Sequence, residues 1–492
     1  MASTHFNGEM VLNICFGQSV TIILSPDMKK LFIFSNDLRL QDNIALYNAS
    51  LGKNGLIAAY IFNPKKWENH NDSPLKIKFQ LNHLHQLKDE LIRKNISFKV
   101  IHADGIKTEV DKILNFVSEY KINEVFINRE YGCNERLRDE NLKSELGEIN
   151  VNLNIFDSSI INPELIKTGT GNYFRVFTPY SKVFRAELTE KDLAILPEPL
   201  DQNLLVEDSD DIPNYELTDE NFLNAISKYP VGSETVINIF EQFVKDKVSD
   251  YKKLRDFPSL DSTSKLSPYL TSGMISAKYC LNKLLETFDD TPGTGQHAWM
   301  NEILWREFYK YIIFHFPRVS QNKSFSEKYD LMKWRDDEKD FQDWCKGRTG
   351  IPLIDAAMTQ LNETGWMHNR LRMVVAMFLT KNLLIDWRRG EQYFMKRLID
   401  GDHASNNGGW QWSASTGVDA APYFRIFNPI TQSEKFDKKG EFIKKFIPVL
   451  KDVPEKLIHN PPNDFRLNIS YPKMIVDLKE SRKRALEAFS NI

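Results

Sequence analysis

Short apolar runs alternate with longer amphipathic stretches between Leu31 and about Phe156. The apolar runs read LFIF, LIAAYIF, ISFKVI, EVFIN and VNLNIF, and the stretches between them include PLKIKFQLNHLHQLKDELIRKN and EVDKILNFVSEYKI. Strands that alternate with helices predict right-handed crossovers and a doubly wound parallel sheet. We therefore expect an α/β domain over residues 28–160. Because Met28 opens its first strand, residues 1–27 are expected to be an extension of unknown role, or Met28 is the true start.

From about Phe222 onward, apolar residues recur at helical spacing, and Gly or Pro falls at the joints. This pattern predicts an all-α domain over residues 222–492. The preceding stretch, DQNLLVEDSDDIPNYELTDENFLN, contains eight acidic residues and no Lys or Arg, which is typical of a solvated segment. Residues 161–221 are therefore expected to link the two domains.

The loop after the first strand, SNDLRLQDN, contains no glycine. A G-x-G-x-x-G turn, which lets a dinucleotide approach a helix N-terminus, is thus absent at this place. The α/β domain is not expected to be a standard dinucleotide site.

The composition narrows the class of protein. Hydrophobic residues make up 41% and charged residues 27% of the chain, a profile typical of soluble globular proteins. No apolar run approaches the roughly 18 residues that a membrane helix needs, so no membrane partner is expected. The four cysteines are far apart and form no CxxC pair, which argues against a disulfide framework or a metal site and fits a reducing, cytoplasmic compartment. With a net charge of -3, a nucleic acid would have to be held by a local basic patch.

Two stretches in the helical half, which contains eight of the nine tryptophans, carry unusual polar faces. In GWMHNRLRMVVAMFL, helical spacing places Trp366, Asn369, Arg370 and Met373 in one arc, and an apolar face in another. Arg372 falls on neither face and should meet a partner elsewhere. In NEILWREFYKYIIF, the residues at i, i+3, i+4 and i+7 are Glu302, Trp305, Arg306 and Tyr309. One such face is more often an ion-pair network than a site, but two in one domain favour a site that grips a base and a phosphate.

The stretch LIDGDHASNNGGWQWSASTG is richer in polar residues than a routine turn, and we expect a polar loop. Gly408 and Gly409 would let the backbone approach a flat ligand closely, while Asp and Asn side chains supply acceptors and donors. An Asx-rich helix cap is the plainer interpretation, although it leaves Trp-Gln-Trp unexplained. Upstream, the hydroxyls of TSKLS precede a Pro-led segment; they suit a phosphate at a helix start or serve as an ordinary N-cap.

Together with FSNDLRLQDN, YKKLRDFP, LLIDWRRGEQYFM and APYFRIFNP, these stretches resemble the cryptochrome/photolyase family, and within it the class I photolyases that split cyclobutane pyrimidine dimers. The resemblance runs from about Lys29 to Pro462. It implies an N-terminal α/β antenna domain and a helical domain that holds FAD in a bent conformation. It also implies the reaction, in which reduced FAD absorbs blue light, passes an electron to the dimer and regains it after the cyclobutane bonds break. The implied partner is UV-damaged DNA, and the chain is expected to act as a monomer.

By position, the resemblance assigns FAD binding to residues in three parts of the helical half of the chain. These residues are Tyr251, Thr263, Ser264, Lys265, Leu266, Ser267, Arg372, Asp400, Gly401, Asp402 and Asn406. Arg372 would pair with Asp400 beside the isoalloxazine, which gives that arginine its partner. Asn406 would lie at flavin N5 and tune its redox and protonation state. Plant-type cryptochromes usually carry Asp there, so Asn406 favours repair over signalling.

The resemblance assigns a second set to the flipped-out dimer and the DNA: Arg255, Glu302, Trp305, Arg306, Asn369, Arg370, Met373, Trp412 and Gln432. Trp305 and Trp412 would stack on the pyrimidines, Glu302 would hydrogen-bond them, and Arg370 would hold the DNA backbone. Base flipping costs least for a distorted, poorly paired dimer, which is itself a source of selectivity. Trp410, Trp387 and Trp334 match the tryptophan chain that re-reduces oxidised flavin from the surface.

In the α/β domain, Asn134 and Glu135 follow the fourth strand at the carboxyl edge of the sheet. They match the position at which relatives bind a folate antenna, 5,10-methenyltetrahydrofolate. The chain departs from those relatives at Ser320 and Gln321, where they carry Cys-Lys. The antenna is therefore expected to be folate, with deazaflavin or no antenna as alternatives.

Three other functions remain open at this point. A (6-4) photolyase would carry HHLAR where this chain has HNRLR, and Asn369 and Met373 do not supply its proton-transferring histidines. A signalling cryptochrome would carry a long disordered tail. A generic flavin electron carrier leaves the dimer-pocket residues unexplained.

Overall fold

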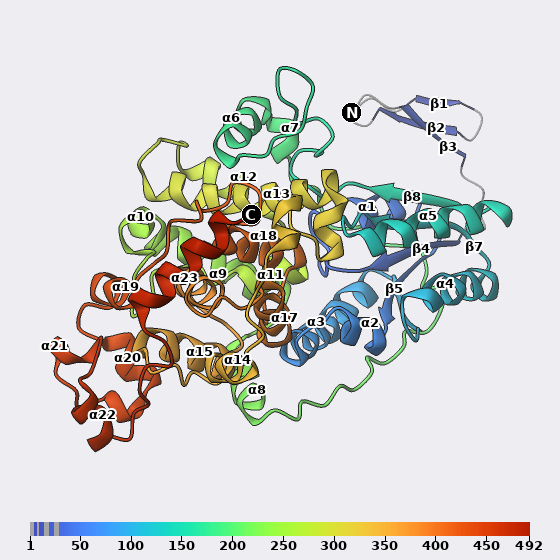
Figure 1. Ribbon diagram of the computed structural model, residues 1–492. Coiled ribbons are helices and arrows are strands. Elements are labelled where there is room, and N and C mark those ends of the chain that lie inside the picture. The colour runs from blue at the N-terminus through green and yellow to red at the C-terminus, as the bar shows by residue number, and fades with distance from the viewer. Residues whose placement is uncertain (1–3, 7–8, 14–18, 24–28) are drawn as a thin grey trace.

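Five parallel strands form the central sheet of the α/β unit, in the order β6-β5-β4-β7-β8 (Figure 1). The strands are β4 (Lys29–Phe34), β5 (Leu56–Phe62), β6 (Ser97–His102), β7 (Ile122–Asn128) and β8 (Asn152–Phe156). The connecting helices are α1 (Ile44–Ser50), α2 (Pro64–Asn69), α3 (Pro74–Arg93), α4 (Ile106–Tyr120) and α5 (Cys133–Glu148). This confirms the predicted doubly wound sheet. Since the chain moves outward in both directions from β4, a crevice is expected at the carboxyl ends of β4 and β7.

Both faces of this sheet are buried, as is usual for parallel strands. On one face, Phe32 and Phe34 of β4 belong to the large core that continues into the helical unit. On the other, Leu31 and Ile33 pack in a smaller core with residues of α4 and α5. The alternation explains why the β4 segment reads as a continuous apolar run.

The computed structural model describes residues 4–6, 9–13, 19–23 and 29–492. Within the expected N-terminal extension, β1 (Thr4–Phe6), β2 (Glu9–Asn13) and β3 (Ser19–Ile23) form a separate antiparallel sheet. The remainder of residues 1–28, which includes Met28 and Cys15, lies outside the described residues.

The expected linker is more structured than its composition indicates. It contains α6 (Phe177–Glu187) and α7 (Glu190–Leu193). Further on, the Asp210 backbone N–H donates to the Phe98 carbonyl (2.8 Å), and the Asp210 carboxylate accepts from the Val100 N–H (2.9 Å). The acidic segment therefore covers the edge strand β6, which blocks edge-to-edge pairing.

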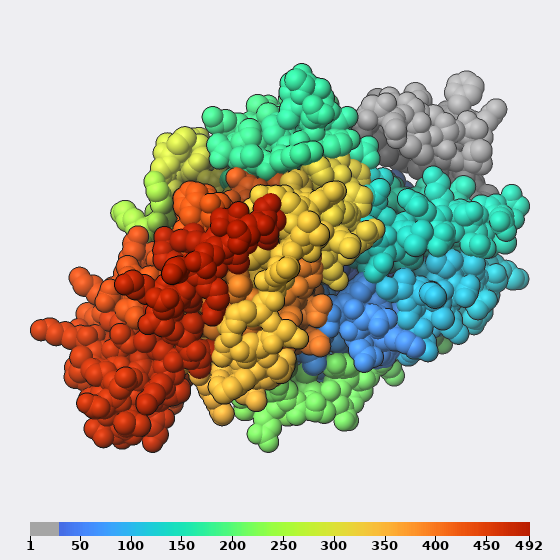
Figure 2. Space-filling view, viewed as in Figure 1, coloured from blue at the N-terminus to red at the C-terminus, as the bar shows by residue number. Residues whose placement is uncertain are grey.

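The rest of the chain is helical, as predicted. From α8 to α13 the elements are α8 (Glu220–Ala225), η1 (Ile226–Lys228), α9 (Ser233–Asp246), η2 (Val248–Asp250), α10 (Tyr251–Leu254), α11 (Ser267–Ser272), α12 (Ala277–Thr287) and α13 (Gly295–His315). Then follow η3 (Pro317–Gln321), η4 (Glu327–Leu331), α14 (Glu338–Cys345), α15 (Pro352–Thr364), α16 (Asn369–Met377), η5 (Phe378–Asn382), α17 (Trp387–Arg397) and α18 (His403–Ala414). The last are α19 (Pro429–Phe436), α20 (Glu441–Phe446), η6 (Pro448–Leu450), α21 (Glu455–Ile458), α22 (Asn463–Asn468) and α23 (Leu478–Ser490). In Figure 2 the chain after about residue 440 forms a lobe at one end, and the last helix runs back across the surface. None of the described helices has the length and apolarity needed to cross a membrane.

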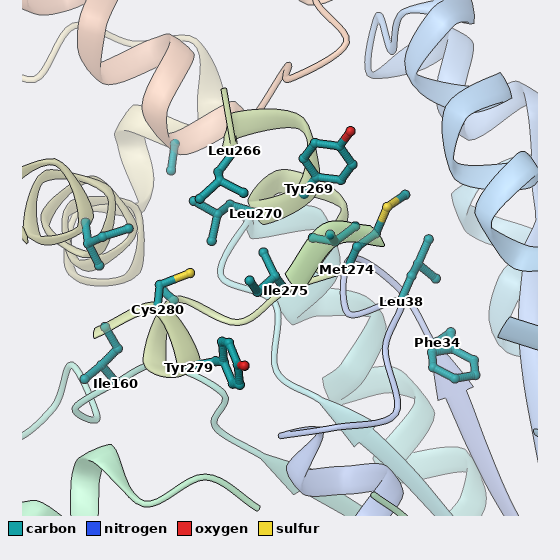
Figure 3. Close-up of a cluster of buried hydrophobic side chains, with 14 of the residues drawn as sticks. Phe34, Leu38, Ile160, Leu266, Tyr269, Leu270, Met274, Ile275, Tyr279 and Cys280 are labelled. Atoms are coloured by element: carbon teal, nitrogen blue, oxygen red, sulfur yellow. The ribbon is translucent and has the colours of Figure 1, made fainter. Parts of the chain in front are cut away.

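A shared core joins the α/β unit to the helical unit. Figure 3 shows Phe34 and Leu38 of the α/β unit beside the buried side chains of the α11–α12 region, such as Met274 and Ile275. At the same joint, the buried Asp42 carboxylate accepts from Ser276 and from Lys278 (2.8 Å for the ion pair). The relative position of the two units is thus fixed by apolar packing and by buried polar contacts.

Candidate active site

The Asp/Asn-rich stretch that was expected to be a loop is a helix. Asp402 is the N-cap of α18, and its carboxylate accepts from the Ser405 N–H (2.7 Å), so the helix-cap interpretation is correct. The two glycines differ in their surroundings. A Cβ on Gly408 would lie 2.2 Å from the Tyr309 ring, whereas one on Gly409 would meet nothing within 4 Å. Gly408 therefore admits a neighbouring aromatic ring from α13, and only Gly409 borders open space.

Arg372 has the partner that its position on α16 requires. Its Nη2 lies 2.7 and 3.0 Å from the two carboxylate oxygens of Asp400. Asp400 is almost completely buried and also accepts from the Ser267 hydroxyl (2.6 Å). Trp366 was expected on the helix face but precedes α16; its indole N–H donates to the Ser267 oxygen (3.3 Å). The pair thus ties α16 to the start of α11.

The residues of the expected FAD set that precede this pair in sequence differ in their exposure. Leu266 and Tyr251 are buried, Thr263 and Ser264 are partly exposed, and Lys265 is exposed with a left-handed backbone (φ 53°). No side chain caps the first turn of α11.

Asn406, on α18, lies against α17. Its amide Nδ2 donates to the backbone carbonyl and to Oε1 of Glu391, both at 3.0 Å. Burial raises the pKa of Glu391 above its ordinary value, although His403 and Asn406 oppose this. Both hydrogen bonds donated by the Asn406 amide therefore go to Glu391, which fixes the orientation of this amide.

Glu302 and Trp305 share one face of α13, as predicted. Glu302 forms an ion pair with Arg255, which follows α10. Burial raises the pKa of the Glu302 carboxyl, and Arg255 opposes the rise. Trp305 and Trp412 are partly exposed, so aromatic surface is accessible beside the carboxylate.

Arg306 is not part of this arrangement. Its guanidinium donates to Glu307 (2.9 Å) and to the Leu270 carbonyl (3.1 Å), and its side chain lines the crevice toward the α/β unit. Burial opposes ionisation of Asp402 there, but Arg306, Ser405 and Lys310 together hold its pKa below the usual range. The structure thus places Arg306 away from Glu302 and Trp305.

Arg370 and its neighbours on α16 belong to the set expected to bind the dimer and the DNA. The Arg370 guanidinium donates to Asp256 (2.8 Å) and lies 4.5 Å from the centre of the Phe436 ring. Asn369 is exposed, and Met373 and Gln432 are partly exposed. The Arg370 cation therefore packs on the last residue of α19, and α16 also carries an exposed amide, Asn369, and a partly exposed thioether, Met373.

The three tryptophans of the expected electron path lie in or against one core. Trp410 and Trp387 are buried in it, and Trp334 packs against its edge, 6.1 Å from Phe489 of α23. Gly390 is required here, because a Cβ would lie 2.2 Å from the Trp410 ring. The Trp387 indole N–H is buried and has no hydrogen-bond acceptor among the described residues.

A crevice of about 400 Å³ lies where the sheet topology predicts it, between the carboxyl ends of the strands and the helical unit. Asn134 and Glu135, in the first turn of α5, line it together with Ser320 of η3. Asn134 Nδ2 lies 3.4 Å from Nε2 of His70, and Glu135 Oε1 lies 3.9 Å from Nδ1 of the same ring. Across the joint, the Cys133 N–H donates to the Ser320 hydroxyl (3.1 Å).

The crevice contains charges of both signs. Deeper in it, Arg138 pairs with Asp139 (2.7 Å) and Glu130 (3.3 Å). On the opposite wall, burial and the neighbouring Arg306 lower the pKa of Lys310 to about 8. A ligand with a polar, aromatic body fits this lining better than an apolar one.

Comparison with known proteins settles the family. A family model described as the FAD binding domain of DNA photolyase matches residues 299–491, and one described as DNA photolyase matches residues 30–200. The deoxyribodipyrimidine photo-lyase of Buchnera aphidicola is 41% identical over 473 residues, which cover 94% of this chain and 96% of that protein. The Escherichia coli deoxyribodipyrimidine photo-lyase is 40% identical over 463 residues, with 93% and 97% coverage. The chain belongs to the DNA photolyase family.

Solved photolyase structures share the fold over nearly the whole chain. A class III photolyase from Agrobacterium tumefaciens has a TM-score of 0.82 at 31% identity and covers 97% of this chain and 99% of its own. A Sulfolobus tokodaii photolyase with two FAD molecules has a TM-score of 0.74 at 30% identity, with 94% and 100% coverage. These comparisons confirm the expected photolyase fold, an α/β domain followed by a helical domain, and the matched FAD-binding domain establishes FAD as the cofactor of that domain.

Sequence reasoning missed two aromatic residues beside the expected site. Trp344 of α14 is fully buried, with its ring centre 6.0 Å from that of Trp410. Phe177 of α6 stacks on Trp305. The signal for Phe177 was present, since FTPYSKVF carries aromatic residues at i, i+3 and i+7 within the expected linker.

Proposed function

We propose that this protein is a light-driven DNA repair enzyme, a deoxyribodipyrimidine photo-lyase that binds FAD and acts on cyclobutane pyrimidine dimers. The observation that carries this proposal is full-length similarity, at about 40% identity, to proteins of that name in Buchnera and Escherichia coli. The partly exposed aromatic and charged side chains of α13 and α16, such as Trp305 and Arg370, supply the matching local chemistry.

The residues around Asp400 suit the flavin. Arg372 and Asp400 offer a cation and an anion held in one geometry, and Gly409 leaves open space on α18 where a flat ring could approach. We assign the hydroxyls of Thr263, Ser264 and Ser267 to the polar remainder of the cofactor. Tyr251, Lys265, Leu266, Gly401 and Asp402 complete the proposed set. Reduced FAD supplies the light-driven electron that opens the cyclobutane ring.

The protein's own task is to select and hold the lesion. Trp305 and Trp412 would each stack on a flipped-out base, a contact worth about 1–3 kcal/mol per base. Glu302 and Asn369 would hydrogen-bond the pyrimidine edges, and Met373 would pack against them. Arg370, Arg255 and Gln432 would contact the DNA backbone, which requires Arg370 to exchange Asp256 for a phosphate. Arg306 is assigned to the crevice instead, because its guanidinium is bound there.

Asn406 is proposed to orient a hydrogen bond toward the flavin. Because its Nδ2 is held by Glu391, its Oδ1 remains available as an acceptor. An amide locked in this way cannot flip to present its donors. Glu391 would then act as a positioning residue for Asn406.

The test is repair of UV-irradiated oligothymidine by the purified, pre-reduced protein under blue light. Repair is measured as the ultraviolet absorbance that returns when dimers are split into thymines. We expect Trp305→Ala and Arg370→Ala to weaken binding to dimer-containing DNA about 10-fold or more while flavin content stays constant. Arg370→Ala should also flatten the salt dependence, since one phosphate contact is lost. Unchanged lesion affinity in both variants would refute the pocket, and absence of light-dependent repair by the wild type would refute the function.

We further propose that the crevice holds a light-harvesting folate, 5,10-methenyltetrahydrofolate, through Asn134 and Glu135. The Glu135 carboxylate suits the donor edge of a pterin ring. Heat denaturation and chromatography of the released chromophores distinguish folate from deazaflavin and from a second flavin. We expect folate in the wild type and its loss in Glu135→Ala with FAD retained; release of another chromophore, or of FAD alone, contradicts the assignment.

We also propose that the enzyme works as a monomer in the cytoplasm, which light scattering and cell fractionation test.

A further inference from the structure

We propose that Phe177, from the segment between the two domains, is a positioning residue for the lesion-binding tryptophan Trp305. This inference rests on the proposed function of Trp305. The two ring centres lie 3.8 Å apart, and the ring planes differ by 8°. Such parallel contact places Phe177 against one face of the indole, which leaves the other face for a base.

The Trp305 ring is restrained on further sides. Phe308 lies three residues after Trp305 on α13. Its ring meets the indole edge-on, at 5.7 Å between ring centres and 78° between planes, and it also contacts the Phe177 ring at 5.8 Å and 72°. Tyr309 lies at 5.5 Å with a tilt of 37°. A partly exposed tryptophan alone could adopt several rotamers. With Phe177 behind it, the indole is held in one orientation before any base arrives, which lowers the entropy cost of binding.

Phe177 is itself firmly anchored. It is buried, with 8% of its surface exposed, and its backbone N–H donates to the Asp419 carboxylate (3.1 Å). Asp419 has a left-handed backbone (φ 45°) and follows Trp412 by seven residues. The carboxylate caps the start of α6, whose N-cap residue Val176 offers no side-chain acceptor. The loop that follows Trp412 on α18 therefore also anchors Phe177, which lies behind Trp305.

The C-terminal part of α6 also contacts α13 and the loop before it. Arg185 donates to Asp290 (2.7 Å) and to Asn301 Oδ1 (3.0 Å), and Tyr180 packs 5.0 Å from Phe308. These contacts place α6 against the middle of α13, from Asn301, directly before Glu302, to Phe308. Lesion recognition thus depends on a segment outside the helical domain.

The test compares binding to an oligonucleotide with one thymine dimer and to the same undamaged sequence. We expect Phe177→Leu to lower the ratio of the two affinities about 3- to 10-fold with flavin content unchanged. Phe177→Tyr, which keeps an aromatic ring at this position, should leave the ratio at the wild-type value. Phe184→Leu is the matched control: the same substitution in a buried residue of the same helix, without contact to Trp305, and it should leave the ratio unchanged. Asp419→Ala, which keeps both rings, should lower the ratio in the same direction.

A double-mutant cycle with Trp305→Ala separates this inference from the proposed function. In the Trp305→Ala background, Phe177→Leu should add less than about a further twofold loss, because the ring that it positions is gone. If Trp305→Ala lowers the ratio but Phe177→Leu does not, or if Phe184→Leu lowers it equally, the positioning role is refuted. If Trp305→Ala itself has no effect, the proposed pocket is wrong.

Discussion

At the scale of single residues, the Arg372–Asp400 pair offers a direct test of the proposed FAD site. Asp400 is 2% exposed in its side chain and Arg372 26%. Removing Arg372 leaves a buried carboxylate without its cation, which costs about 3–5 kcal/mol. We expect Arg372→Ala and Asp400→Ala to purify without FAD, measured by the flavin-to-protein absorbance ratio. Arg389→Ala, which breaks an exposed pair with Glu338, should keep full flavin content; wild-type occupancy in both site variants would contradict the assignment.

Trp334 allows repair to be separated from recharging of the cofactor. It packs at the edge of the core that holds Trp387 and Trp410, and contacts Phe489 instead of the Arg372–Asp400 site. Phenylalanine keeps most of the apolar volume but is much harder to oxidise. Trp334→Phe should therefore abolish photoreduction of oxidised flavin by an external reductant, followed anaerobically by flavin absorbance. Dimer splitting with chemically pre-reduced protein should persist, and its loss would show that Trp334 supports DNA binding.

At the scale of elements, the contrast between two adjacent glycines of α18 gives a matched pair of variants. Gly408→Ala drives a Cβ into the Tyr309 ring, and overpacking of this kind costs about 1–3 kcal/mol. Gly409→Ala meets open space and removes a helix-breaking residue, worth up to about 1 kcal/mol in the opposite direction. The midpoint temperature of thermal unfolding, measured on the flavin-free proteins, should thus fall for Gly408→Ala and not for Gly409→Ala. Equal shifts would mean that α18 does not approach α13 as described.

The same helix shows where sequence patterns suffice and where they do not. The period of apolar runs predicted the parallel sheet, and the position of Arg372 off both helix faces predicted a separate partner. α18 was taken for a loop because Asn and Gly are poor helix formers, while tertiary packing against Tyr309 and the Asp402 cap decide its conformation. The face that contained Trp366 extended one turn too far, because the helix begins only after the His368 cap. Phe177 was overlooked because a partner far away in sequence gives it its role.

At the scale of the whole molecule, His83 couples the joint between the domains to pH. It is fully buried on α3, accepts the Gly232 N–H at Nδ1 (3.2 Å), and donates from Nε2 to the Leu38 carbonyl (2.8 Å). Burial lowers its pKa to about 4. The unfolded chain therefore binds a proton at higher pH than the folded one, so stability falls as the pH drops from about 6.5 to 4, by up to about 3 kcal/mol.

Chemical denaturation across that range measures the effect. His83→Gln, which retains an acceptor and a donor, should be less stable at neutral pH but should lose this part of the acid dependence. An unchanged pH slope in the variant would assign the dependence to other groups.

The solitary indole N–H of Trp387 has a consequence for how charge could cross the helical domain. A tryptophan that has given up an electron is a far stronger acid than neutral indole, and it loses its proton where a base or water can take it. Around Trp387, no described residue accepts that proton, so the ring stays a cation and can be neutralised only by an electron from a neighbour. Trp334, partly exposed at the edge of the same core, can instead release its proton to solvent. On the proposed path, the interior ring would therefore conduct and the peripheral ring would trap, so positive charge would move outward, from Trp387 to Trp334.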